Sequence, residues 1–255
     1  MKVILPVAGY ATRLYPLTEN KPKALLPVGG KPMLDIIVQK IDEVQEINEI
    51  ILVSNDKFAQ AFVTWASTCV SDKDLHVIND GTKSNEDRLG SLGDLALALK
   101  LKSIEEDILV IAGDNLFGFS LADFVAFAQE KNTSAIAVYD VKNLEYAKQF
   151  GIVSLNAAQV ITEFVEKPSQ PTSSLAATMC YYLKKEDIAL IETYLAEGNK
   201  PDRAGDFISW LVKKKQVHAY TFQQYWYDIG TREQYDTVSQ KFKFSSSLRS
   251  HENLD

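Results

Sequence analysis

Short apolar runs alternate with segments of helical periodicity along the first half of the chain. The runs KVILP, EIILVS and DILVI have the length and composition of buried strands. Between them, apolar residues recur at helical spacing, as at Leu34, Ile37 and Ile41, which predicts amphipathic helices. The expected strands are 2–8, 49–54, 75–78 and 107–113, and the expected helices are 33–47, 58–65 and 92–101. This alternation predicts an open, mostly parallel α/β sheet with helices on both faces.

The pattern changes after about residue 134. Four closely spaced β-like runs follow at 135–141, 150–155, 159–166 and 176–183, with one short helical connection at most. Helices are then expected at 186–196, 206–212 and 231–242. We interpret the four runs as an antiparallel extension of the first sheet. Residues 1–242 then form one domain, and 243–255 form a polar C-terminal tail that is frayed at its end.

Composition narrows the class of protein. The chain has 255 residues, 46% of them hydrophobic, and a net charge of 27 − 34 = −7. This apolar share supports a packed core, and the acidic balance argues against nucleic acid as a partner. Cys69 and Cys180 are too few for a disulfide framework. Arg13 interrupts the opening apolar run too early for a signal peptide or a membrane span, so we expect a cytoplasmic protein with no membrane partner.

The long loop at residues 8–32, here called the first loop, is the strongest candidate for function. Four basic residues against Glu19 give it a local charge of +3. It follows the carboxyl end of a predicted parallel strand, where open α/β sheets bind ligands. Backbone amides near Gly9, together with Arg13 and Lys23, could clamp a polyphosphate. The charge alone is equally consistent with a solvated loop whose basic residues face water. The loop contains neither a G-x-G-x-x-G motif nor a P-loop motif.

Within this loop, the stretch VAGYATRLYPLTENKPKALLPVGGKPML resembles the signature A-G-x-G-T-R-L-x-P-x-T…P-K-x-L-L-P-V-x-x-K-P of the sugar-1-phosphate nucleotidyltransferases. That family includes glucose-1-phosphate thymidylyl- and uridylyltransferases and mannose-1-phosphate guanylyltransferases. The resemblance continues in order along nearly all of residues 1–242. It implies a Rossmann-like nucleotide-diphospho-sugar transferase sheet, with the antiparallel extension binding the sugar. In one departure, Ala11 replaces the family's second glycine. In a left-handed backbone its β-carbon would cost ~1–2 kcal/mol.

Two aspartates are candidate metal ligands. Asp114 directly follows the apolar run DILVIAG, and a carboxylate at that position suits Mg²⁺. Local sequence alone favours a capping or turn role for Asp114 over a ligand role. The resemblance implies that Asp114, in G-D-N, and Asp228, in W-Y-D-I-G, are the family's two metal-binding aspartates, with Mg²⁺ as cofactor.

The resemblance also assigns the substrate contacts. E-K-P implies that Lys167 meets the sugar 1-phosphate and that Glu166 accepts hydrogen bonds from sugar hydroxyls. Gly151 matches a glycine that approaches the sugar closely, and Arg203 is the match for a sugar-phosphate arginine. The residues implied for the nucleotide are Ala8, Gly9, Thr12, Asn85 as a base-reading amide, Gly90, Ser91 and Gly93. Without the resemblance, Glu-Lys pairs and turn glycines are ordinary surface features.

The expected activity is transfer of a nucleotide from a nucleoside triphosphate to a sugar 1-phosphate, with release of pyrophosphate. Arg13 and Lys23 would hold the triphosphate, and Lys167 would orient the attacking phosphate. Glucose 1-phosphate with dTTP or UTP is the first expected pair. Two alternatives stay open: a non-catalytic nucleotide or sugar-nucleotide binding protein, and a cytidylyl- or guanylyltransferase acting on another phosphate. A glycosyltransferase is disfavoured because no D-x-D motif stands at Asp114. The sequence is compatible with a homo-oligomer and does not decide the oligomeric state.

Overall fold

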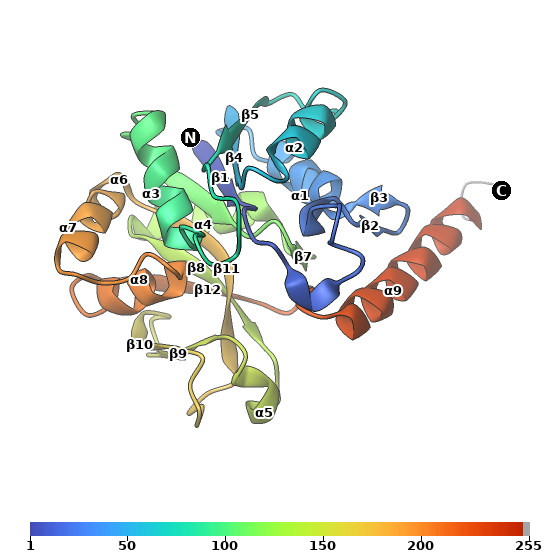
Figure 1. Ribbon diagram of the computed structural model, residues 1–255. Helices are drawn as coiled ribbons and strands as arrows, with labels where there is room; N and C mark the ends of the chain where they lie inside the picture. The colour runs from blue at the N-terminus through green and yellow to red at the C-terminus, as the bar shows by residue number, and fades with distance from the viewer. Residues whose placement is uncertain (252–255) are drawn as a thin grey trace.

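A mixed sheet forms the centre of the molecule, and helices cover both of its faces (Figure 1). The structure is a computed structural model that describes the backbone of residues 1–251 and the side chains of residues 1–242. The strands of the main sheet are β1 (Lys2–Pro6), β4 (Glu49–Ser54), β5 (Asp74–Asn79), β6 (Ile108–Ile111), β8 (Ala135–Asp140), β9 (Gly151–Leu155), β10 (Ile161–Glu166), β11 (Leu175–Leu183) and β12 (His218–Phe222). Two small ribbons pair β2 (Pro27–Val28) with β3 (Lys31–Pro32), and β7 (Asn115–Phe117) with β13 (Trp226–Asp228).

The helices connect and flank these strands. They are α1 (Met33–Asp42), α2 (Ala59–Ala66), α3 (Ser91–Leu101), α4 (Leu121–Lys131), α5 (Leu144–Ala147), α6 (Lys185–Ile188), α7 (Leu190–Ala196), α8 (Ala204–Leu211) and α9 (Arg232–His251), with 3₁₀ turns η1 (Thr12–Leu14) and η2 (Lys23–Leu25) in the first loop. Helix α9 projects from the side of the molecule (Figure 1). Its base is tied to the β2–β3 ribbon by the Tyr235 hydroxyl, which donates to the Pro27 carbonyl at 2.7 Å.

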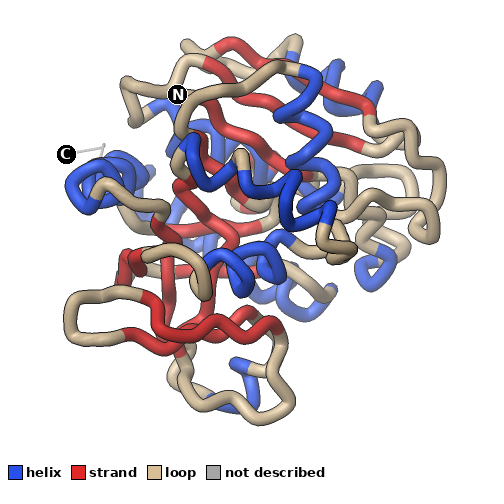
Figure 2. The backbone as a smooth tube through the Cα atoms, turned by 90° about the vertical axis from the view of Figure 1, so that its left-hand side faces the viewer, coloured by secondary structure: helices blue, strands red, loops and turns tan. Residues whose placement is uncertain are grey.

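The sheet is parallel in one half and antiparallel in the other. Strands β5, β4, β1 and β6 lie side by side and run parallel. Strand β11 then pairs antiparallel with β6 and leads to two branches: β9–β10 on one side, and β8 with β12 on the other. Figure 2 shows the β9–β10 branch as a lobe below the main sheet. The predicted α/β sheet with an antiparallel extension is therefore confirmed.

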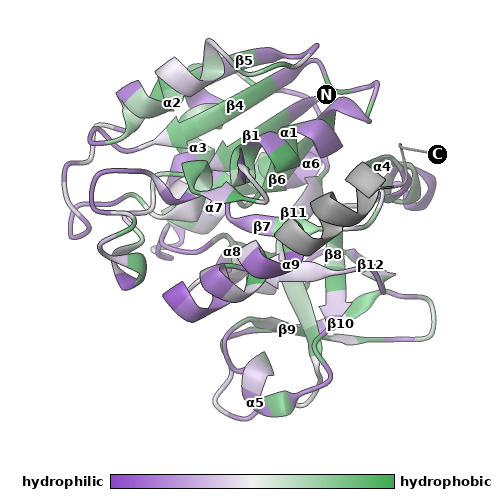
Figure 3. Ribbon diagram, turned by 90° about the vertical axis from the view of Figure 1, so that its right-hand side faces the viewer, coloured by the Kyte–Doolittle hydropathy of each residue, from purple (hydrophilic) through white to green (hydrophobic). Residues whose placement is uncertain are grey.

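Alternate residues of the buried strands pack into two separate cores. Val3 and Leu5 of β1 face the core beneath α1, α2 and α4, while Ile4 faces the core beneath α3 and α8. This alternation follows from the two-residue period of a strand. Figure 3 shows β4 coloured hydrophobic along most of its length, with helices that contain hydrophilic segments around the sheet. A sheet covered on both faces exposes only the ends of its strands, and the loops there carry the candidate site.

Most predicted elements appear close to their expected positions, but several differ. The helix expected at 33–47 ends at Asp42, and the one expected at 186–196 is divided into α6 and α7. Helix α4 and strands β7, β12 and β13 were not predicted. Helix α9 continues to His251 rather than ending at Phe242, and the end of the predicted tail, 252–255, lies outside the described residues. In the described part of the chain, no helix is long and apolar enough to cross a membrane.

Candidate active site

The first loop is held in a fixed shape by side-chain to backbone hydrogen bonds. The Thr18 hydroxyl donates to the Ala11 carbonyl at 2.8 Å, and the Asn55 amide donates to the Ala8 carbonyl at 2.7 Å. Ala11 adopts the left-handed conformation, with φ 48° and ψ 42°. Beside it, the α-carbon of Gly9 faces open space. The loop therefore presents Gly9 and Arg13 at the carboxyl end of β1.

A cavity of about 240 Å³ lies between this loop and the end of β6. Arg13, Lys23 and Asp114 all line it. The Lys23 ammonium forms an ion pair with the Asp114 carboxylate at 2.5 Å. The floor is tight, because a β-carbon at Gly113 would lie 2.4 Å from the Val7 side chain. Cationic groups opposite an open glycine fit a phosphate chain.

A second cavity, of about 250 Å³, adjoins the first and shares Arg13 and Asp114 with it. All four residues predicted to bind the sugar line this cavity: Gly151, Glu166, Lys167 and Arg203. Asp228 and Ser91 line it as well. Because both cavities meet at Asp114, a ligand in one can contact a ligand in the other.

Asp114 and Asp228 come together through the β7–β13 ribbon. In this ribbon Asp228 lies directly opposite Asn115, and the Ile229 amide donates to the Asp114 carbonyl at 3.4 Å. Burial and the nearby Asp114 charge raise the pKa of Asp228 to about 6, although Lys23, Arg13 and Lys167 oppose that rise. All five charged residues predicted for this chemistry therefore surround one point.

The two aspartates fit a magnesium site in which the protein supplies only some of the ligands and the substrate phosphates supply the others. In the described part of the chain, no three His, Cys, Asp or Glu side chains gather closely enough to hold a metal. Mg²⁺ commonly binds one or two carboxylates together with substrate phosphates, and the phosphate cavity adjoins Asp114. Burial and the Asp114 charge both disfavour the ionised form of Asp228, and a bound cation would offset them. The buried Oδ1 of Asn115, directly opposite Asp228, also has no hydrogen-bond partner.

A bulge in β11 supports the Asp114 turn from behind. The pairing of β11 with β8 shifts register between Ala177 and Tyr181, and Met179 within this stretch has a φ of 52°. The Met179 carbonyl accepts a hydrogen bond from Ala112, and the Thr178 carbonyl accepts one from the Asn115 side chain. Bulges commonly redirect backbone groups near functional sites. This one fixes the residues on either side of Asp114.

The sugar-binding residues predicted from E-K-P lie at the junction of β9 and β10. Gly151 pairs with Glu166 across these strands, and the Lys167 amide donates to the Phe150 carbonyl at 3.0 Å. Lys167 itself has a φ of 49°, an uncommon conformation for a non-glycine residue. Burial raises the pKa of the Glu166 carboxyl, against the opposing charges of Lys167 and Arg203. These contacts direct both side chains toward the second cavity.

Most residues of the predicted nucleotide-binding segment, 84–93, lie outside both cavities. The Ser91, Leu92 and Gly93 amides at the start of α3 donate to the carbonyls of residues 201 and 202. Gly90 packs against the backbone of Asp202, which would lie 2.4 Å from a β-carbon. Asn85 is exposed, and it lines neither cavity. Ala8, Thr12, Gly90 and Gly93 do not line either cavity.

Several pocket residues were not predicted from sequence. They are Ala112, Asn115, Gln149, Phe150, Ala177, Thr178, Met179, Tyr181, Ala204 and Gly205, all of which line the second cavity. Most are apolar or backbone contacts from β11 and its neighbours, and such residues carry no local signal of chemistry. Gly205 carried none either, since it precedes the helix expected at 206–212.

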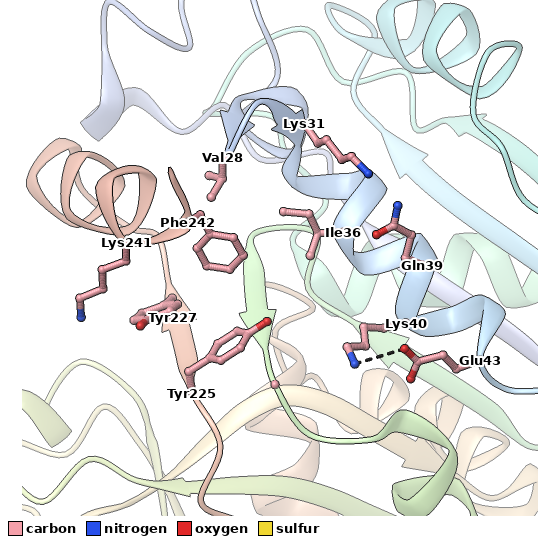
Figure 4. A pocket seen from close by; sticks show the side chains of 12 residues that line it. Val28, Lys31, Ile36, Gln39, Lys40, Glu43, Tyr225, Tyr227, Lys241 and Phe242 are labelled. Carbon is pink, nitrogen blue, oxygen red and sulfur yellow. Dashed lines mark hydrogen bonds and ion pairs between the residues drawn. The ribbon is translucent and has the colours of Figure 1, made fainter. Parts of the chain in front are cut away.

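A separate cavity of about 590 Å³ lies on the far side of the β7–β13 ribbon (Figure 4). Ile36 and Lys40 of α1, Tyr225 and Tyr227 near β13, and Phe242 of α9 line it. The two tyrosine rings stack at 5.5 Å, and Phe242 meets Tyr225 edge-on. None of the residues predicted for catalysis lies in this cavity.

Comparison with known proteins agrees with this geometry. Residues 2–244 match the family described as nucleotidyl transferase. The chain is 31% identical to the bifunctional protein GlmU of Methanocaldococcus jannaschii over 232 residues, which cover 90% of this chain and 51% of that protein. It is 25% identical to the UTP–glucose-1-phosphate uridylyltransferase AglF of Haloferax volcanii, covering 95% of this chain and 97% of that protein. The chain thus spans about half the length of the first of these curated relatives.

The fold also matches solved structures. A UDP-glucose pyrophosphorylase complexed with UDP-glucose superposes with a TM-score of 0.83 at 21% identity, covering 96% of this chain and 98% of that one. At this identity the match establishes the fold alone. The family match spans nearly the whole chain, and it agrees with the motif of the first loop and the resemblance drawn from it. This protein belongs to the nucleotidyl transferase family, and the relatives that it matches include sugar-1-phosphate nucleotidyltransferases.

Proposed function

We propose that this protein transfers a nucleotide from a nucleoside triphosphate to a sugar 1-phosphate and releases pyrophosphate. The observation that carries the proposal is the pair of adjoining cavities that meet at Asp114. One is lined by the cations of the first loop, and the other by a buried carboxylate and glycines. A triphosphate and a sugar phosphate bound in the two cavities would bring their reacting phosphates to the same point.

In the proposed reaction, an oxygen of the sugar phosphate attacks the α-phosphorus in line, and pyrophosphate departs. Arg13 and Lys23 bind the triphosphate and neutralise charge that develops on the departing pyrophosphate. Lys167 holds the attacking phosphate, which could not otherwise approach a second anion. No side-chain nucleophile is required, so catalysis consists of positioning and charge neutralisation.

The proposed cofactor is Mg²⁺, held by Asp114 and Asp228. When bound, it would supply positive charge beside the α-phosphate. The Lys23 ammonium pairs with Asp114. Lys23 can therefore exchange between the carboxylate and a phosphate of the substrate, because a lysine side chain is a mobile point charge.

The first substrates to test are glucose 1-phosphate with UTP or dTTP. The name of the Haloferax volcanii relative includes both UTP and glucose 1-phosphate, and that protein matches along nearly its whole length. Asn85 remains the proposed base-reading residue, although in this structure it lies in an exposed loop. A cytoplasmic location is part of the proposal, in keeping with two cysteines that are both free thiols.

A grid of five nucleoside triphosphates against several sugar 1-phosphates, with pyrophosphate release as the readout, tests the function. We expect one or two pairs to give turnover that depends on Mg²⁺. Binding of a triphosphate or nucleotide-sugar without turnover for any pair would instead favour the non-catalytic alternative. Absence of both binding and turnover would overturn the proposal.

Lys23→Met, compared with Lys21→Met, tests the role of the first loop. Lys23 lines the phosphate cavity, whereas Lys21 is exposed in the same loop. We expect Lys23→Met to lower kcat/KM roughly a hundredfold or more, since it removes charge stabilisation from the transition state. Lys21→Met should change it less than twofold. Equal effects from the two variants would show that only the general charge of the loop matters.

A further inference from the structure

The carboxylate of Glu166 is enclosed on two sides. Its Oε1 lies 3.9 Å from the Arg203 guanidinium, and Arg203 is itself held by Asp206 at 2.9 Å. Its Oε2 faces the α-carbons of two glycines, Gly151 of β9 and Gly205 of α8. Only 13% of the Glu166 side chain is exposed. The position of this carboxylate is thus set by the Arg203 guanidinium on one side and by glycine backbone on the other.

Neither glycine could carry a side chain without moving its neighbours. A β-carbon at Gly205 would lie 2.3 Å from Oε2 and 3.1 Å from Cδ of Glu166. One at Gly151 would lie 3.0 Å from Oε2, but also 2.5 Å from the Phe164 ring. At Gly205 the close neighbour is therefore the carboxylate itself, whereas at Gly151 it is mainly the core.

The backbone does not require glycine at position 205. Its φ lies outside the left-handed range, and it is in the first turn of α8, so no backbone conformation there calls for glycine in place of a better helix former. The space that Glu166 occupies is then the reason for glycine here. We propose that Gly205 is a positioning residue, which lets the Glu166 carboxylate lie against α8 at the depth where it accepts hydrogen bonds from sugar hydroxyls.

The inference rests on the proposed function, and a double-mutant cycle on Gly205 and Glu166 tests it. With glucose 1-phosphate, or the sugar phosphate selected by the grid, Gly205→Ala should raise the KM for sugar phosphate tenfold or more. The KM for the triphosphate should change less than twofold, because the phosphate cavity is untouched. In a Glu166→Asp background, the shorter carboxylate leaves room for the methyl group. Adding Gly205→Ala there should change the sugar-phosphate KM less than twofold.

Ser209→Ala is the matched control. Ser209 lies one turn further along α8, and its hydroxyl donates to the Phe164 carbonyl of β10 at 2.7 Å. It should leave the sugar-phosphate KM within twofold, since it disturbs the same helix and strand without adding volume beside Glu166. Thermal melting of all variants separates loss of folding from loss of sugar binding. If Gly205→Ala does not fold, the pair Glu166→Asp and Glu166→Asp/Gly205→Ala still decides the question.

The outcomes separate this inference from the proposed function. An active wild-type enzyme with an unchanged sugar-phosphate KM in Gly205→Ala would overturn the positioning role and leave the function standing. Equal losses from Gly205→Ala in both backgrounds would also overturn it, because the methyl group would then disturb something other than Glu166. A wild-type protein inactive with every pair in the grid would count against the proposed function first.

Discussion

Ala11 illustrates how one side chain changes a functional loop. It adopts a left-handed backbone in which a β-carbon is unfavourable, and it lines the phosphate cavity. The turn is nevertheless maintained, because the Ala11 carbonyl accepts a hydrogen bond from buried Thr18. Strain of this kind persists where surrounding contacts determine the backbone. The departure from the family glycine therefore alters stability and cavity volume while the path of the chain is kept.

Ala11→Gly should stabilise the folded protein by about 0.5–1 kcal/mol, because relief of the left-handed strain exceeds the added entropy of the unfolded chain. Loss of the methyl group also widens the phosphate cavity, so turnover should be unchanged or higher. Urea unfolding with and without a triphosphate measures the first effect, and steady-state kinetics the second. A less stable variant would show that the methyl group contributes packing that outweighs the strain.

At the scale of elements, α3 is joined to the end of β5 by two acidic side chains. Asp94 of α3 is buried, with a carboxyl oxygen that has no hydrogen-bond partner other than the neighbouring carboxyl group of Asp80. The other oxygen of Asp80 accepts hydrogen bonds from the Thr82 amide and hydroxyl. Burial, with the added repulsion of Asp80, raises the pKa of Asp94 to about 8. A pKa of about 8 keeps Asp94 mostly protonated at neutral pH.

Stability should fall as pH rises from about 4 to 8, because the folded protein binds a proton at Asp94 that the unfolded chain has already released. The slope from this group should be roughly 1 kcal/mol per pH unit. Asp94→Asn cannot ionise and can still donate to Asp80, so its stability relative to wild type should increase over this range. Urea unfolding at pH 5 and pH 8 measures the difference. An equal advantage at both pH values would show that Asp94 is ionised in the folded state.

At the scale of the whole molecule, the site depends on segments that are far apart in sequence. The first loop follows β1, Asp114 follows β6, Lys167 follows β10, and Asp228 ends β13. The parallel half of the sheet brings the first two together, and the β7–β13 ribbon returns Asp228 to the same place. Burial, with the added charge of Asp114, raises the pKa of Asp228, so its ionised form is less stable there than in water, although three nearby cations oppose the rise.

Asp228→Asn should separate stability from function. Removing this charge relieves repulsion with Asp114, so the variant should melt at an equal or higher temperature than wild type at pH 7.5 without Mg²⁺. Its turnover should fall roughly a hundredfold or more, because a charge that binds Mg²⁺ is lost. Asp236→Asn, an exposed carboxylate on α9, is the control and should change neither property. Near-normal Mg²⁺-dependent turnover in Asp228→Asn would exclude Asp228 as a metal ligand.

Sequence by itself determined the features that depend on residues close together along the chain. The alternation of apolar runs gave the parallel strands and most helices, and the motif of the first loop identified Arg13, Lys23 and the family. It missed α4, although a Ser120 cap and apolar residues at helical spacing mark that helix, and it missed β12. The β7–β13 ribbon was also missed, because each of its strands has only three residues and is recognisable only by its partner.

Only the tertiary structure decided which side chains meet. Nothing local to Gly205 indicates that it lies against Glu166, and nothing local to Asp94 indicates a second carboxylate beside it. The Ser91 and Gly93 amides, in the segment predicted to bind the nucleotide, bind the 201–202 carbonyls across the start of α3. Periodicity and turn chemistry act over a few residues, so they specify elements. Contacts between elements depend on how strands pair and helices cover them, which no single segment encodes.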